Sequence, residues 1–408
     1  MIKILLILLP VAIYAQSLKS LLDFAMKRSD LVVAKSFLKE AKSHEVEARK
    51  SAYYPTLDAG AYYQSLEERS PMFPGDTYSG YAKLGLDIYD GGKKSSLLSQ
   101  SKNTYKSSSF DLEATRKDLS LKIVQGFFAI KSLEATLQAR DEAKKSLKEQ
   151  LTRMQRFYLA RVATQDDVDR LQAAYDTNVY EMEALRFQIL TFMKTLELHV
   201  GQNITSLDSA KFQPFQESDL ELIDKVKSLN AQKDALKSGV KSVDSVYYPQ
   251  LRVEDTYSLY GYNRSDILHP KGVDNQNKLL LTLNLRLFDN GTLSKTKEAL
   301  LSNTQALNTQ VIYATKEQKM QYDLALARIQ TSTIKIRSAK SALVSATSAF
   351  KTISKKYDAG IVDNVVYLDA LSSQTNAKAL YETSLNDLEV AYAIYYYYAG
   401  KNLEEFLQ

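Results

Sequence analysis

The sequence predicts a mainly helical fold with a small transmembrane β part, built from two copies of one pattern of helices and strands. Three observations lead to this fold class. Leucine alternates with polar residues in the second strand of two predicted β-hairpins, at 56–89 and 250–288. Each hairpin is followed by a proline-free stretch, 92–157 or 292–357, that predicts one very long helix. Corresponding residues of the two copies lie 199 positions apart, as Asp90 and Asp289 do.

The strand 278–288 shows the alternation most clearly, and the strand 81–89 repeats it. Because successive side chains of a strand point to opposite faces, each strand has one apolar and one polar face. A soluble sandwich would bury the apolar face, whereas a transmembrane barrel would turn it to lipid and keep the polar face in a wet lumen. On the barrel interpretation, the lumen residues are Lys83, Asp87, Lys278, Asn284 and Arg286. The lipid-facing residues are then Leu84, Leu86, Ile88, Leu279, Leu281, Leu283, Leu285 and Leu287. Asp255 interrupts the apolar face of the neighbouring strand 250–262.

The chain is predicted to consist of an amino-terminal signal peptide and two structural repeats. The first residues combine Lys3 with a short apolar core and a small residue, Ala15, which is typical of a secretory signal. Each repeat contains a helix, a hairpin, a long helix, a shorter helix and a connector. The predicted bounds are 1–15 for the signal peptide, 16–217 for the first repeat and 218–408 for the second. The helices before the hairpins are expected at 18–52 and 219–246, and the shorter helices at 165–200 and 364–399.

Composition excludes several classes of function. The 408 residues contain no cysteine, so disulfides and thiolate metal sites are excluded. With 53 basic and 48 acidic residues, no basic patch stands out, and nucleic acid is not an expected partner. The histidines His44, His199 and His269 are scattered without a ligand partner at metal spacing. We therefore expect no catalytic residue, no cofactor and no metal site, and any energy must come from a partner protein.

Four strands per chain cannot close a barrel on their own. Barrels that span membranes need at least about eight strands, because open sheet edges are forbidden in lipid. Two copies of the chain would supply eight strands and three copies twelve. The sequence alone leaves both numbers open.

These features taken together resemble the TolC-type outer-membrane efflux protein family over essentially the whole mature chain. The resemblance depends on the duplicated architecture and on motifs at matching places. The motifs are Tyr-Tyr-Pro at 53–55 and 247–249, Asp-Gly-Gly at 90–92, Asp-Asn-Gly at 289–291, and helix breaks at 158–164 and 357–362. The resemblance implies a homotrimer in contact with outer-membrane lipid. Its 12-stranded β-barrel would continue into a coiled-coil helical tunnel across the periplasm, with the connectors as a belt around the tunnel.

By the same resemblance, the two helix breaks lie at the periplasmic tip, where they close the tunnel and dock a periplasmic adaptor (membrane fusion) protein. Asp369 matches an acidic position that helps to form a constricting ring of carboxylates in relatives. Asp167 matches a position that helps to latch neighbouring helices, and Asp363 completes the predicted gate. The expected docking residues are Ala160, Arg161, Val162, Ala163, Ala359, Gly360, Ile361 and Val362.

This sequence departs from the family pattern at two tip positions. Arg161 stands where the first tip usually has glycine, so that turn must form without one. Val366 stands where some relatives have a second acidic residue, so a gate here would carry one carboxylate ring rather than two.

The resemblance implies a passive outer-membrane exit duct of a tripartite efflux or type I secretion system, energised by a proton-driven or ATP-driven inner-membrane pump. The alternative is a structural periplasmic coiled-coil scaffold or surface fibre, with the hairpins packed in a soluble cap. The cargo is not predicted, because selection in such systems lies mostly in the pump.

Overall fold

The computed structural model describes residues 16–67, 75–214, 219–263 and 273–408. The predicted signal peptide therefore lies outside the described residues, as do parts of the two hairpin loops and of the first connector. The chain forms two compact units. The helical unit consists of Met1–Ser36, Leu112–Asp224 and Thr315–Gln408, and the sheet unit consists of Phe37–Asp111 and Lys225–Ala314.

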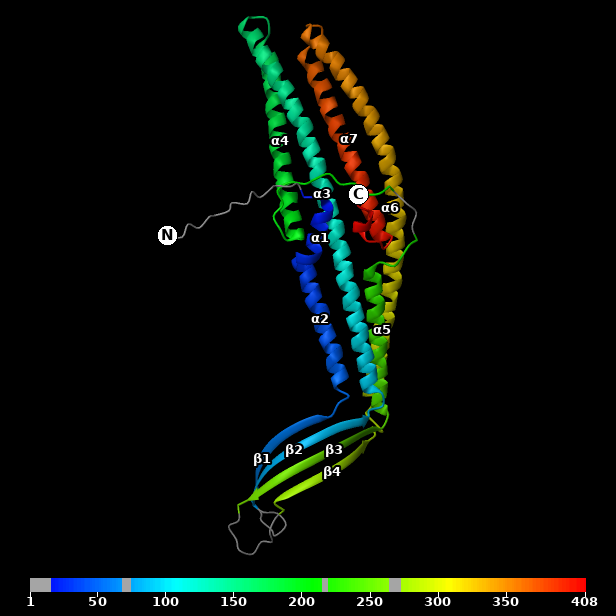
Figure 1. Cartoon of the computed structure of the whole chain (residues 1–408). Helices are drawn as coiled ribbons and strands as arrows, with labels where there is room; N and C mark the ends of the chain where they lie inside the picture. The colour runs from blue at the N-terminus through cyan, green and yellow to red at the C-terminus, as the bar shows by residue number, and fades with distance from the viewer. Residues whose placement is uncertain (1–15, 68–74, 215–218, 264–272) are drawn as a thin grey trace, which may run out of the picture. The chain divides into compact units, whose positions relative to one another are not determined.

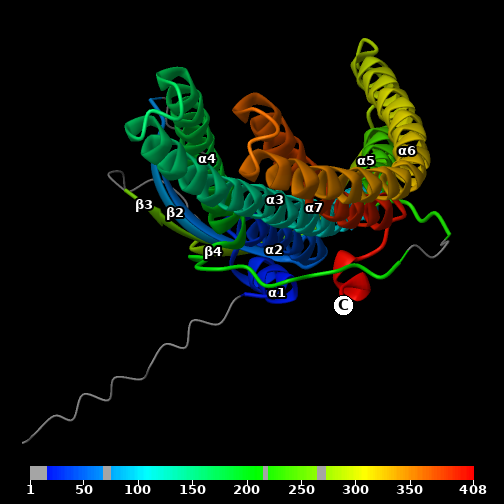
Figure 2. The ribbon, with the colours of Figure 1, turned by 90° about the horizontal axis from the view of Figure 1, so that it is seen from above.

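Four long helices form two helical hairpins, each closed by a short turn (Figure 1). In the first hairpin α3 (Lys93–Leu159) turns into α4 (Gln165–Val200), and in the second α6 (Thr292–Asp358) turns into α7 (Asn364–Tyr398). All four helices begin and end within two residues of the predicted bounds. Within the helical unit, α3 and α7 lie side by side between α4 and α6 (Figure 2). The Lys378 ammonium bonds the Glu142 carboxylate at 2.6 Å across the α3–α7 boundary.

The helices that precede the β-hairpins differ from the prediction. The expected helix 18–52 is divided into α1 (Leu18–Arg28) and α2 (Asp30–Ser51) by the buried, extended Ser29. Cations end α1 and an acid begins α2, the charges that suit a helix end and a helix start. Helix α5 spans Asp224–Asp244 and begins later than expected, because the preceding residues bond to α6 and α7 instead.

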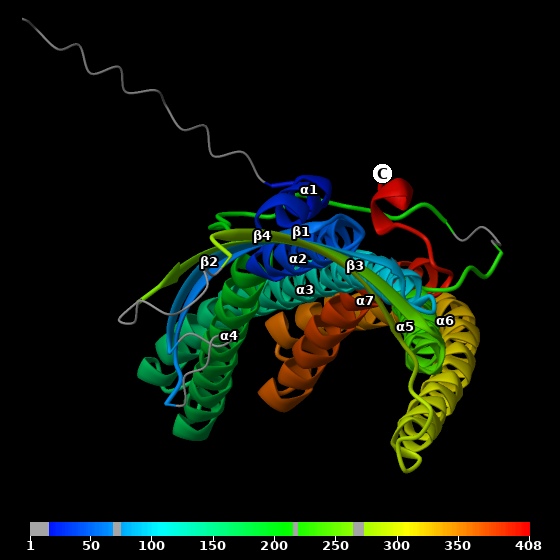
Figure 3. The same cartoon turned by 90° about the horizontal axis from the view of Figure 1, so that it is seen from below.

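The sheet contains four antiparallel strands in the order β1-β2-β3-β4, drawn in Figure 3 as one curved layer. The strands are β1 (Thr56–Ser65), β2 (Asp76–Tyr89), β3 (Gln250–Tyr262) and β4 (Asn275–Asn284). The central β2–β3 pair joins the two sequence repeats. The predicted end of the last strand at 288 is wrong. Its partner β3 begins at Gln250, directly after Pro249, so β4 has nothing to pair with beyond Asn284.

The core of the helical unit lies where the helices meet the connectors. Leu21 and Leu22 of α1, Phe127 of α3, and Tyr395 and Tyr396 of α7 are completely buried there. Short bridges join Gln16, just before α1, to Leu207 of the first connector, and Phe212 of that connector to Leu407 of the second. The Tyr396 ring also stacks on Phe406 with ring centroids 3.8 Å apart. The four-tyrosine run 395–398 thus contributes mainly to packing.

In the described ranges, no helix combines the length and apolar composition needed to cross a membrane. Nor does any group of three or more His, Asp or Glu side chains in those ranges lie in a position to hold a metal ion.

Candidate gating site at the helix turns

The turns that close the two helical hairpins have the same backbone. Each contains one residue in the left-handed conformation, Arg161 with φ of 62° and Gly360 with φ of 74°. The next residues, Val162 and Ile361, each donate a backbone N–H at 2.8 Å to the carbonyl five positions earlier. This is the Schellman pattern, in which glycine is usual at the left-handed position. The expectation that the first turn forms without a glycine is confirmed.

The predicted docking residues occupy both turns and are mostly exposed. Val162 and Ile361 are the large apolar residues among them, and 74% and 70% of their surfaces are exposed. Ala160, Arg161, Ala359 and Gly360 are also exposed, whereas Ala163 and Val362 are half-buried. Both turns therefore present one large apolar side chain at the same place. Val162 and Ile361 lie 199 positions apart, the offset of the sequence repeat.

The helix starts after the turns bring Asp167 and Asn364 together. Thr164 caps α4 and forms a reciprocal capping box with Asp167. Asp363 caps α7 by accepting the Val366 backbone N–H at 3.0 Å. The buried Asn364 then donates to the Asp167 carboxylate at 3.1 Å and to its backbone carbonyl at 3.3 Å. Asp167 thus lies at a junction between the two hairpins, whereas Asp363 acts as a helix cap.

A second polar junction links the ends of the two long helices. The Arg153 guanidinium of α3 pairs with the Asp358 carboxylate of α6 and donates to the Asp358 carbonyl at 2.9 Å. Both side chains are partly exposed, so water competes for this contact. No sequence pattern indicates this pair, because Arg153 and Asp358 lie 205 positions apart and match no motif.

A stack of two tyrosines supports the second turn. The Tyr357 and Tyr367 rings lie 4.7 Å apart in a buried cluster with Ala143, Leu147 and Leu371. Burial raises the pKa of the Tyr367 hydroxyl well above its ordinary value. In contrast, Tyr158, the counterpart of Tyr357 in the first turn, is 43% exposed.

Asp369 lies on α7 between Tyr367 and Leu371 of this cluster, but its own side chain is exposed. It forms no hydrogen bond or ion pair with any residue of the described part of the chain. The fold of one chain thus leaves this carboxylate in solvent and does not join it to Asp167 or Asp363.

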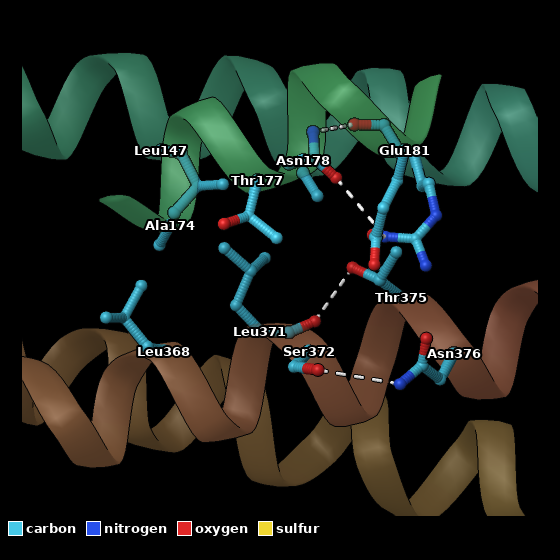
Figure 4. Close-up of a pocket in the computed structure, with 12 residues that line it drawn as sticks. Leu147, Ala174, Thr177, Asn178, Glu181, Leu368, Leu371, Ser372, Thr375 and Asn376 are labelled. Atoms are coloured by element: carbon cyan, nitrogen blue, oxygen red, sulfur yellow. Dashed lines mark hydrogen bonds and ion pairs between the residues drawn. The ribbon is translucent and has the colours of Figure 1, made fainter. Parts of the chain in front are cut away.

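Behind the turns, a pocket of about 350 Å³ separates the first hairpin from α7 (Figure 4). Leu147 and Leu371 line its apolar end. At the polar end, Arg140 pairs with Glu181, and the buried Asn178 donates to the Arg140 carbonyl at 3.0 Å. The two hairpins are therefore not packed tightly against each other along this stretch.

The strand register separates the sheet into a leucine face and a polar face. Leu84 lies opposite Asp255, which lies opposite Leu279. In the next residue pair along the strands, Lys83 lies opposite Thr256, which lies opposite Lys278. The same register places the remaining paired residues of the predicted sets on their expected faces. These are Leu86, Leu281 and Leu283 on the leucine face, and Asp87 and Asn284 on the polar face.

Four of the predicted face residues do not have a paired position in the sheet. A register shift between Asp87 and Tyr89 leaves Ile88 unpaired, because a bulge inserts one extra residue into β2. Leu285, Arg286 and Leu287 lie beyond the end of β4. The strand register therefore does not assign these four residues to either face, and their predicted lipid-facing or lumen positions remain predictions.

The polar face also carries an ion network that the sequence reasoning missed. Arg252 of β3 bonds Asp87 at 2.8 Å and Glu254 at 2.9 Å, and Lys94 bonds Asp87 at 3.1 Å. The alternation of the strand 250–262 places Arg252 and Glu254 on one face, so the signal was present. On the leucine face, one oxygen of the half-buried Asp255 has no hydrogen-bond partner among the described residues.

Comparisons with known proteins agree with this architecture. The pattern that defines the family "Outer membrane efflux protein" matches residues 21–202. Over 406 residues, the chain is 21% identical to the outer membrane protein TolC of Vibrio cholerae serotype O1, covering 94% of this chain and 91% of that protein. The Campylobacter jejuni CmeC outer membrane channel superimposes with a TM-score of 0.84 at 15% identity, covering 95% of this chain and 86% of the other. For the Vibrio cholerae outer membrane protein VceC the TM-score is 0.82 at 14% identity, covering 95% and 96%.

The fold and these matches define an outer-membrane channel protein that extends into the periplasm. Residues 21–202 match the outer membrane efflux protein family, and over most of its length the chain is a homologue of the TolC-type channels. Because the family consists of channels, the chain is not an enzyme. The predicted family and location are confirmed.

Proposed function

We propose that three copies of this chain form a passive exit duct, opened at its helix turns by a periplasmic adaptor and energised by an inner-membrane pump. The duct would serve a tripartite efflux or type I secretion system. The single observation that carries this proposal is the sheet, which has two unlike faces and two open edges. A polar face suits a water-filled lumen, and a leucine face suits acyl chains.

Closure by sister chains follows from the sheet edges. The outer edges of β1 and β4 lack a partner strand within the described chain. Unpaired backbone groups are costly in lipid, so the edge β4 of one copy would pair with β1 of the next. Three copies would close a barrel of twelve strands, the number that the resemblance to TolC-type proteins implies.

Opening would begin at the contacts between the two hairpins. The Asp167–Asn364 hydrogen bonds and the Arg153–Asp358 pair are few and partly exposed. Such contacts contribute about 1 kcal/mol each, so a docked adaptor has enough binding energy to replace them. The exposed Val162 and Ile361 offer apolar docking points, and the pocket behind the turns gives the hairpins room to shift.

Asp369 would contribute one carboxylate per copy to a ring at the closed end. Three such charges near one axis repel one another and attract cations. Replacing Asp369 with Asn should lower the cation selectivity of the purified channel in a lipid bilayer and weaken its block by divalent cations. Unchanged selectivity and block would rule out the ring without affecting the rest of the proposal.

Cross-linking the hairpins tests the opening step. Asp167→Cys with Asn364→Cys places two thiols at the junction, in a chain that has no other cysteine. Joining them with a short bifunctional reagent should abolish export while leaving the assembly intact. Asp166→Cys with Arg170→Cys is a matched control, because it links one turn of α4 without joining the hairpins. Full export with complete cross-linking at 167 and 364 would contradict the proposed opening.

The scaffold alternative loses its support, because the family is one of channels. It would regain support if the purified protein remained in solution without detergent and gave no conductance in lipid bilayers.

A further inference from the structure

The near-balance of acidic and basic residues over the whole chain does not hold along α6. Residues 324–357 contain seven cationic side chains and no acidic one. All seven are exposed, and within the described part of the chain none of them forms an ion pair. They are Arg328, Lys335, Arg337, Lys340, Lys351, Lys355 and Lys356. The expectation that no basic patch stands out is therefore wrong for this helix.

Two of these cations line a groove in the helical unit. Arg328 and Lys335 lie along a hollow of about 490 Å³ whose walls come from α3, α6 and α7. The two cations lie seven positions apart along α6, which places them on the same side of the helix and roughly 10 Å apart. Among the described residues, no acidic one lines the groove. Its positive field is therefore not neutralised from within.

The remaining lining gives the groove both an apolar and a hydrogen-bonding part. Leu121 of α3, Leu324 of α6 and Ile394 of α7 supply apolar surface. Gln125 and Tyr398 add an amide and a hydroxyl to the lining. A volume of this size is typical of sites for small molecules, which combine an apolar lining with a few placed polar groups.

We propose that this groove binds amphipathic organic anions, molecules with an apolar ring or chain body and a carboxylate, sulfonate or phosphate group. The anionic group pairs with Arg328 or Lys335, and the body lies on Leu121, Leu324 and Ile394. Arg328 offers the planar fork of donors that matches such oxyanions. The binding site stands on the groove alone, but its role as a station for exported cargo rests on the proposed duct.

Two related dyes test the site in the full-length protein, purified as the assembly it forms. The anion 1-anilinonaphthalene-8-sulfonate and the uncharged N-phenyl-1-naphthylamine share a ring system and differ in the sulfonate. Fluorescence titrations in one detergent at one concentration give every variant the same micelle background. Arg328→Gln with Lys335→Gln should weaken binding of the anionic dye by about 10-fold, because two exposed charge contacts are lost. Binding of the uncharged dye should change less than about 2-fold.

The matched control removes two cations of α6 that do not line the groove, Arg337→Gln with Lys351→Gln. This variant has the same net charge as the groove variant and should bind the anionic dye like the wild type. A third variant, Leu324→Ser, should weaken binding of both dyes. The site is overturned if the groove variant binds the anion as tightly as the wild type. It is equally overturned if the control loses as much affinity, or if a sister chain covers the groove and the wild type binds neither dye in a saturable way.

Conductance of the same preparations in lipid bilayers separates this result from the proposed function. If the channel conducts but the variants do not discriminate between the dyes, the proposed anion site is contradicted and the proposed duct is not. If the protein binds the anionic dye at the groove but never conducts, the proposed anion site is supported and the proposed duct is contradicted.

Discussion

The turns at the ends of the two helical hairpins have the same backbone conformation but differ in the side-chain packing beneath them. Both close with the same hydrogen bonds around one left-handed residue. Beneath the second turn, Tyr357 is buried against Tyr367, whereas the matching Tyr158 of the first turn is exposed. The counterpart of Tyr367 in the first hairpin is the half-buried Val168. The repeated sequence thus preserves the backbone shape of the turn, whereas packing against neighbouring helices makes the second turn more stable than the first.

Removing the two matching tyrosines should give the largest contrast. Tyr357→Ala empties part of a buried cluster and should lower the local stability of the second turn by about 3 kcal/mol. Tyr158→Ala removes an exposed ring and should change the stability of the first turn by no more than about 0.5 kcal/mol. Hydrogen exchange of the backbone amides in each turn measures both effects. Equal losses at the two turns would contradict the difference in support.

Substituting the left-handed residue of each turn should give smaller changes in turn stability, with opposite signs at the two turns. Gly360→Ala meets no neighbouring atom, so its cost comes only from the positive φ and should be about 1 kcal/mol. Arg161→Gly relieves the same strain and should stabilise the first turn by a similar amount. The same amide exchange measurement checks both changes. If Arg161→Gly loosened the first turn, contacts of the arginine side chain would outweigh its backbone strain.

The smallest contrast lies at the other end of the hairpins, where α7 carries Glu389 and the matching position of α4 is the exposed Leu190. Burial raises the pKa of Glu389, although the Phe212 backbone N–H bonds its carboxylate at 2.6 Å and partly opposes that shift. A raised pKa means that the folded chain holds the proton more tightly than the unfolded chain. The stability linked to this group is therefore fully present below the ordinary glutamate pKa and is lost as pH rises through the folded value.

Comparing thermal unfolding of the wild type with Glu389→Gln checks this sign. Glutamine keeps an acceptor for the Phe212 N–H but does not ionise. The wild type should lose stability relative to Glu389→Gln as pH rises above the ordinary glutamate pKa of about 4.3. A wild type that gained stability over that range would show that the carboxylate is better solvated than its burial indicates. Leu190→Gln is the matched control and should give a difference from the wild type that does not depend on pH.

The regular parts of the fold were readable from the sequence because they follow strong periodic patterns. Long proline-free stretches defined α3 and α6, and alternating leucines defined the two faces of the sheet. The missed details depend on contacts between distant residues. Ser29 divides a helix whose apolar pattern continues on both sides, and β4 ends where its partner strand ends.

The candidate site divides in the same way. The turns and the caps at Thr164 and Asp363 follow from local sequence, so their positions could be predicted. The Arg153–Asp358 pair and the Tyr357–Tyr367 stack join residues of different helices, and no local pattern indicates them. The cations of α6 were visible in the sequence, but a count over the whole chain hid them among acids located elsewhere.

The most direct test of the account is the environment of two neighbouring residues of β4. Leu281 lies on the leucine face and Thr282 on the polar face. Single cysteines at these positions, labelled with a fluorophore in the membrane-reconstituted protein, report contact with lipid or water. The account predicts that a lipid-bound quencher acts on the label at 281 and a water-soluble quencher on the label at 282. Equal access of the water-soluble quencher to both labels would contradict a leucine face in contact with acyl chains.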